Sequence, residues 1–188
     1  GQKGTGKWTG INALDLGVPL TLITESVYAR CLSSMKEQRQ AAETLFNKTI
    51  QPVNGDKEVW LELLRQALLA SKIISYAQGF MLMHEASEEH QWGLDYGNVA
   101  LMWRGGCIIR SGFLNNIRDA YRNTSDLQFL GTDPYFKNIL VDCIEAWRKV
   151  AAKSIEIGLP MPCITSALTF LDGYTTSRLP ANMIQAQR

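Results

Sequence analysis

The stretch from Glu58 to about His90 constrains the fold of this chain more than any other part of the sequence. It contains no proline and a single glycine. Its apolar side chains recur at helical spacing around a very broad face, at Trp60, Leu64, Leu68, Ile74, Ala77, Met81 and Met83. This pattern predicts one long central helix, and a helix so broadly apolar must be covered on more than one side.

Shorter helical segments are predicted on both sides of the central helix. They are expected at about Trp8 to Leu16, Pro19 to Ser34, Lys36 to Lys48, Gly97 to Trp103, Ser111 to Arg122, Tyr135 to Ile157, Met161 to Tyr174 and Pro180 to Gln187. Gly17 is expected to end the first helix, and Gln51 to Asp56 to form a loop. No segment alternates as a strand does, so the sequence predicts an all-α, multi-helix domain spanning residues 1–188.

Charge and cysteine usage narrow the functional class. Lysine and arginine number 19 against 18 acidic residues, so no excess charge favours binding to nucleic acid or to a membrane. No signal peptide or membrane-spanning segment is predicted. The sequence has four cysteines, Cys31, Cys107, Cys143 and Cys163. Each has apolar neighbours in sequence, and no two of them form a C-x-x-C pair. We therefore expect buried, reduced thiols and a cytoplasmic location.

The opening segment Gly1–Trp8 nearly has the spacing of a nucleotide-binding P-loop. Trp8 stands where a P-loop needs serine or threonine to hold magnesium, and no strand is visible before the loop, so we reject an ATPase. The segment still combines flexible glycines, Lys3, Thr5 and a following helix N-terminus, which is the chemistry of a phosphate site. From the pattern alone, an ordinary turn before a helix is the more common case.

The sequence contains two histidines, the residue type that most often binds a metal. His84 and His90 are six residues apart, which places them on different faces of a helix. No cysteine or carboxylate completes a recognisable set, so we expect no metal.

The segment from Trp103 to Arg110 could suggest a second anion site. Paired glycines between apolar helices more often permit close packing, and this is the role we expect for Gly105 and Gly106. Arg104 and Arg110 are then expected to form ion pairs.

The motifs of this chain resemble those of the 6-phosphogluconate dehydrogenase family. The opening segment is similar to the family signature, an acidic residue, a small residue and then Q-K-G-T-G-x-W, although the acidic position falls before Gly1. The resemblance continues in the family's order through Tyr28–Ser34, Lys72–Phe80, Met102–Arg110, Pro160–Cys163 and Ile184–Arg188. It implies the C-terminal helical domain of this family, truncated at both ends.

The resemblance also implies a substrate site. In the family, the residues matching Lys3, Thr5 and Arg30 bind the phosphate of 6-phosphogluconate, and the residue matching Arg188 reaches the same site from the partner subunit. A guanidinium, an ammonium and a hydroxyl suit a phosphate dianion. Without the family, Arg30 would be interpreted as a surface ion pair and Arg188 as a solvated terminus.

The activity implied is NADP-dependent oxidative decarboxylation of 6-phosphogluconate to ribulose 5-phosphate, in the pentose phosphate pathway and without a metal. The family is also dimeric through its helical domain. NADP is bound mainly by an N-terminal Rossmann domain, and the acid and base lie in a K-x-x-H-N-x-x-E pattern. Neither the glycine fingerprint of that domain nor that pattern occurs in this sequence. We therefore expect no catalytic residue in this chain, and no activity from it alone.

Two alternatives are compatible with parts of the sequence. The first is a non-enzymatic helical oligomerisation module whose phosphate loop is an inherited turn. The second is a related 3-hydroxyacid dehydrogenase with another substrate, since these enzymes also pair a nucleotide domain with a helical one. Lys3, Thr5 and Arg30 together favour a phosphorylated acid.

Overall fold

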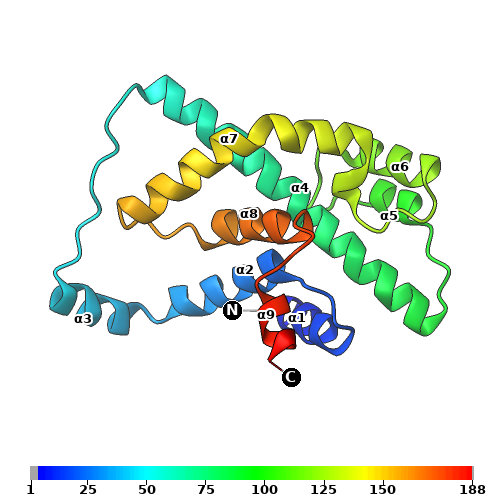
Figure 1. Ribbon diagram of the computed structural model, residues 1–188, viewed down its shortest axis with the longest axis horizontal. Coiled ribbons are helices and arrows are strands. Elements are labelled where there is room, and N and C mark those ends of the chain that lie inside the picture. The colour runs from blue at the N-terminus through cyan, green and yellow to red at the C-terminus, as the bar shows by residue number, and fades with distance from the viewer. Residues whose placement is uncertain (1–3, 188) are drawn as a thin grey trace.

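The computed structural model describes residues 4–187, which fold entirely into helices and loops, without a strand among them (Figure 1). The α-helices are α1 (Thr5–Asp15), α2 (Thr21–Ser34), α3 (Lys36–Phe46), α4 (Lys57–His90), α5 (Tyr96–Met102), α6 (Leu114–Asn123), α7 (Pro134–Glu156), α8 (Pro162–Tyr174) and α9 (Ala181–Ala186). A short 3-10 helix, η1 (Leu130–Thr132), precedes α7. The predicted all-α class is confirmed.

The predicted long central helix is α4, whose 34 residues begin one residue before the expected start and end at the expected His90. Asp56 caps its N-terminus, because its carboxylate accepts a hydrogen bond of 2.7 Å from the backbone N–H of Glu58. Gln91 ends the helix in the left-handed conformation, with φ 55°. Helix α7 crosses α4 on one side, while α8 lies between these two helices and α2 (Figure 1).

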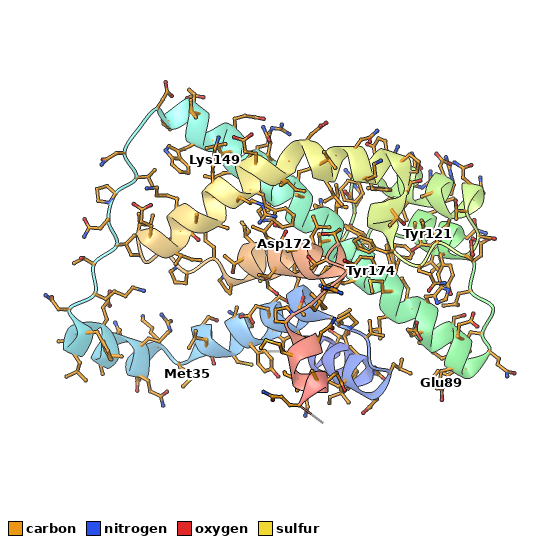
Figure 2. The ribbon with its side chains drawn as sticks, viewed as in Figure 1. Met35, Glu89, Tyr121, Lys149, Asp172 and Tyr174 are labelled. Carbon is orange, nitrogen blue, oxygen red and sulfur yellow. The ribbon has the colours of Figure 1, made fainter. Side chains whose placement is uncertain are left out.

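The core lies where α4, α6, α7 and α8 meet. Its largest fully buried side chains include Phe80, Ile117, Phe129, Phe136 and Trp147. Tyr121, labelled in Figure 2, packs with its ring centroid 5.1 Å from that of Phe80, and burial raises its pKa. The indole N–H of Trp147 donates to the Ile164 carbonyl at 3.0 Å, so α7 is tied to α8 by both packing and a hydrogen bond.

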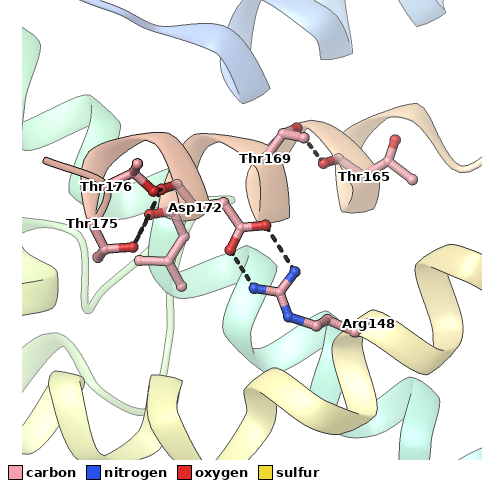
Figure 3. Close-up of polar contacts among 7 residues, drawn as sticks. Arg148, Thr165, Thr169, Asp172, Thr175 and Thr176 are labelled. Atoms are coloured by element: carbon pink, nitrogen blue, oxygen red, sulfur yellow. Dashed lines mark hydrogen bonds and ion pairs between the residues drawn. The ribbon is translucent and has the colours of Figure 1, made fainter. Parts of the chain in front are cut away.

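A salt bridge between Arg148 and Asp172 joins α7 to α8 at the surface (Figure 3). The guanidinium donates through both Nη atoms, and the Nη1–Oδ2 distance is 2.8 Å. The hydroxyls of Thr175 and Thr176 donate to the carbonyls of Leu171 and Asp172 at the end of α8. Because Arg148 and Asp172 are both well exposed, we expect the pair to stabilise the fold by less than about 1 kcal/mol.

The expectation of four buried thiols was wrong for three of the cysteines. Cys143 is buried, but Cys107 and Cys163 are only partly buried and Cys31 is exposed. Apolar neighbours in sequence occur on every side of a helix, so they do not determine which face a cysteine occupies. Burial raises the pKa of both the Cys143 and Cys163 thiols.

The expected packing role of Gly105 and Gly106 was also wrong. A Cβ added at either residue would meet nothing within 4 Å, and Gly106 instead has a φ of 70°. The glycine is therefore needed for the turn rather than for close approach. Arg104 donates to the Asn115 side chain at 3.2 Å, and within residues 4–187 neither Arg104 nor Arg110 forms an ion pair.

In the part of the chain that the structure describes, no helix is both long and apolar enough to cross a membrane.

Candidate functional site

A small pocket lies between the start of α1 and the middle of α2. Its volume is about 220 Å³, and it is lined by Gly4, Thr5, Gly6, Lys7, Ser26, Val27 and Arg30. Two of the residues assigned to a phosphate site by resemblance, Thr5 and Arg30, thus line the same pocket from different helices. The other two, Lys3 and Arg188, lie outside the described residues.

The N-terminus of α1 forms one wall of the pocket. Helix α1 begins at Thr5, three residues before the predicted start, because Gly4 adopts the left-handed conformation with φ 88° and turns the chain into the helix. The first backbone hydrogen bond runs from Trp8 N–H to the Gly4 carbonyl at 3.0 Å. The N–H groups of Thr5, Gly6 and Lys7 precede that bond and have no partner within the helix. They stand at the positive end of the helix dipole, where an anion is stabilised.

Gly6 allows α1 to approach α2 closely, whereas Gly10 leaves room for a Cβ in ordinary contact. A Cβ built on Gly6 would lie 2.8 Å from Val27 Cγ2, a distance that real side chains do not adopt. One turn later, a Cβ on Gly10 would lie 3.6 Å from Thr24. Any larger residue at Gly6 would therefore force Val27 or the two helices to shift beside Thr5 and Arg30.

Arg30 lies on an exposed face of α2 and forms the wall of the pocket that faces α1. Its Nη1 lies 3.4 Å from Ser33 Oγ, and the Ser33 hydroxyl in turn donates to the Arg30 carbonyl at 2.8 Å. No ion pair involves Arg30 among residues 4–187, so the surface ion-pair interpretation gains no support. The guanidinium keeps most of its donors for a ligand.

The charges around the pocket favour an anion. Lys7 and Arg30 contribute two cationic groups to its lining, and none of the lining residues among 4–187 carries a carboxylate. The resemblance assigned no role to Lys7, which occupies the variable position of the family signature. Ser26 was also missed, although its place four residues before Arg30 on a helix predicts that the two side chains share a face.

No metal centre is evident within the described ranges, where no three His, Cys, Asp or Glu side chains come together as ligands. His84 stacks on Tyr96 with ring centroids 5.8 Å apart, and its Nε2 lies 3.1 Å from the side-chain nitrogen of Gln128. His90 instead contacts Trp92, with centroids 4.8 Å apart. Both histidines have packing roles.

Fold and pocket together define an all-helical domain with a small cationic site at a helix N-terminus. The sequence model of one family, "6-phosphogluconate dehydrogenase, C-terminal domain", matches residues 1–188. The chain therefore belongs to the 6-phosphogluconate dehydrogenase family and corresponds to its C-terminal domain.

Known relatives agree with this assignment. The chain is 70% identical over 188 residues to the decarboxylating 6-phosphogluconate dehydrogenase of Haemophilus influenzae, and 55% identical over 189 residues to that of Homo sapiens. In each case the match covers 100% of this chain and 39% of the relative. The chain thus spans about two fifths of the length of these enzymes.

A solved structure has the same fold. The 6-phosphogluconate dehydrogenase of Plasmodium falciparum superposes with a TM-score of 0.95 at 39% identity, over 100% of this chain and 41% of the other. That enzyme is described in its apo form, with its cofactor NADP+ and with its substrate 6-phosphogluconate.

Proposed function

We propose that this chain binds the substrate phosphate and forms the dimer contact in a decarboxylating 6-phosphogluconate dehydrogenase. Such an enzyme oxidises and decarboxylates 6-phosphogluconate to ribulose 5-phosphate with NADP, in the pentose phosphate pathway. The observation that carries the proposal is the shared pocket of Thr5 and Arg30, which offers cationic and hydroxyl donors at a helix N-terminus.

Each group in the pocket has a definite task. The Arg30 guanidinium can hold two phosphate oxygens at once, and the Thr5 hydroxyl and the free N–H groups of α1 can donate to a third. Lys3 adds an ammonium, and Arg188 of the partner subunit adds a second guanidinium to balance the negative charge of the phosphate. Holding the phosphate fixes the far end of the sugar acid, so that its reacting carbons are presented in one orientation.

The oxidation itself depends on groups that we place outside residues 1–188. When bound, NADP accepts a hydride from the substrate, and we expect another part of the enzyme to bind it. The residues of this chain contribute substrate binding and orientation, require no metal, and are expected to show no turnover alone. A cytoplasmic location fits an enzyme of soluble sugar phosphates.

Exposed apolar side chains support self-association of this domain. They occur on α3 at Leu45 and Phe46, on α4 at Leu61, Leu64 and Leu68, and on α9 at Met183 and Ile184. An apolar groove of about 340 Å³ lies beside this part of α4, lined partly by Trp60, Leu61 and Leu64. Apolar surface on this scale is typical of a contact between subunits, so we propose a homodimer through the helical domain.

Titration of the isotopically labelled chain tests the phosphate site. On adding 6-phosphogluconate, the backbone amide signals of Thr5, Gly6 and Lys7 are expected to shift, because their N–H groups receive the phosphate. Gluconate, which lacks the phosphate, is expected to leave them in place. Arg30→Ala should weaken the response, whereas Arg122→Ala, which removes an exposed arginine from α6, should not.

The same titration separates the proposal from its alternatives. An oligomerisation module with an inherited turn would show no shift with either compound. A dehydrogenase domain for an unphosphorylated acid would respond to gluconate as strongly as to 6-phosphogluconate.

Mixed dimers of the full-length enzyme test whether Arg188 acts on the neighbouring subunit. One subunit carries Lys3→Ala and the other Arg188→Ala, and each homodimer is expected to be weak because each cation supports phosphate binding. In the mixed dimer, one site then has both defects and the other has neither, so activity should reappear on mixing.

The opposite arrangement predicts a different result. If Arg188 served its own subunit, both sites of the mixed dimer would carry one defect. Mixing would then restore nothing, even with subunit exchange confirmed by mass spectrometry.

A further inference from the structure

The N-terminus of α2 has no cap from its own sequence. Its N-cap residue, Leu20, is apolar and makes no side-chain hydrogen bond to the helix. The missing partner comes from α4, where the side chain of Gln78 is fully buried, with 0% of its surface exposed. Its Oε1 accepts hydrogen bonds from the backbone N–H groups of Leu22 at 3.0 Å and Ile23 at 3.3 Å.

The other half of the Gln78 amide is also satisfied. Its Nε2 donates to Thr21 Oγ1 at 3.0 Å, so the amide bonds three successive residues at the start of α2. An apolar residue at this position would leave two backbone N–H groups buried without a partner. Gln78 therefore constrains both the position and the rotation of the α2 N-terminus relative to the central helix.

The two walls of the phosphate pocket are attached to α4 by different contacts. The end of α1 and the connection to α2 are held by an apolar cluster in which Ala13, Val18 and Leu20 pack against Met81 and Leu82. The first turn of α2 is bonded to α4 by the amide of Gln78, and the rest of α2, which carries Ser26 and Arg30, packs against α8. A change at Gln78 can therefore move the α2 wall relative to the α1 wall.

We infer that Gln78 is a positioning residue of the substrate-phosphate site, acting through α2 on Arg30. This inference rests on the proposed phosphate site. Gln78 itself does not line the pocket, so its effect on binding is indirect.

Kinetics of the full-length enzyme test this role. Gln78→Met keeps the length of the side chain but removes the cap, and it is expected to raise KM for 6-phosphogluconate about tenfold, because a small displacement of a binding group is costly. KM for NADP should remain within about twofold, because α2 holds the sugar phosphate rather than the cofactor. Gln78→Glu retains an oxygen that can accept from both N–H groups, and the Thr21 hydroxyl can donate to its second oxygen, so this variant should recover most of the substrate affinity.

Two controls distinguish positioning from loss of stability. Ser87 is a buried residue of α4 that accepts a hydrogen bond from Leu94 N–H at 3.2 Å, far along the helix from α2. Ser87→Ala should lower the melting temperature without changing either KM. In an Arg30→Ala background, Gln78→Met should add little further effect, because the group it positions is already gone.

The kinetic results distinguish an error in the proposed phosphate site from an error in the role of Gln78. If Arg30→Ala leaves KM for 6-phosphogluconate unchanged, the proposed phosphate site is wrong. If Arg30→Ala raises that KM but a folded Gln78→Met enzyme does not, the positioning role of Gln78 is overturned. Should Gln78→Met fail to fold by circular dichroism, Gln78→Asn decides: its amide is one methylene shorter, and an unchanged KM in that folded variant would refute the inference.

Discussion

Replacing Arg30 with alanine in the full-length enzyme is expected to raise KM for 6-phosphogluconate by about ten- to a hundredfold, corresponding to a loss of roughly 1.5 to 3 kcal/mol for a charge-assisted bond to phosphate. KM for NADP should change far less. The reason is geometric: Arg30 stands across a pocket of about 220 Å³ from Thr5 and the first turn of α1, and no carboxylate of the described part of the chain lines that pocket.

A conservative variant sharpens the test. Arg30→Lys keeps the charge but loses the planar pair of donors, so its KM should fall between those of the native enzyme and Arg30→Ala. Arg122→Ala is the matched control for loss of one surface charge. Substrate kinetics that remain native in Arg30→Ala would remove this residue from the site.

Replacing Trp147 with alanine is expected to lower the free energy of unfolding by about 3 to 5 kcal/mol, the usual cost of deleting a large buried aromatic side chain. Trp147 is fully buried where α7 meets α8. Truncation would leave a cavity and also remove the 3.0 Å hydrogen bond to the Ile164 carbonyl, which ties the two helices together. Urea denaturation followed by circular dichroism measures the change.

The chain offers a control of the same residue type. Trp92 is 58% exposed in the loop after α4, so Trp92→Ala should cost less than about 1 kcal/mol. Similar losses for the two variants would show that Trp147 does not hold the core together.

Local sequence signals determined the helices of this protein. The proline-free stretch from Glu58 to His90 predicts α4 to within one residue, because an apolar side chain every three or four residues is a property of a single segment. Helix α7 was predicted from Tyr135 and begins one residue earlier, at Pro134, for an equally local reason. The Asp133 carboxylate accepts from Tyr135 N–H at 3.0 Å, and proline suits the first turn.

The residues of the candidate site were predicted by another route. The local pattern indicated a glycine-rich turn before a helix in which Lys3 and Thr5 could bind phosphate, and the resemblance to the family assigned that role and added Arg30. Their common pocket supports that assignment. Lys3 and Arg188 remain predictions.

Tertiary structure alone decided which side chains meet across the fold. Nothing in the local sequence distinguishes Gln78 from the exposed polar residues of α4, yet it caps α2 from 56 residues away. Gly6 lies in the first turn of α1 and Gly105 shortly after α5, but of the two only Gly6 is required for close approach, because Val27 of another helix faces it. The apolar residues next to Cys31 in the sequence likewise do not indicate that its face of α2 is exposed. Periodicity specifies the faces of a single helix, whereas the partner of each face depends on how several helices pack together.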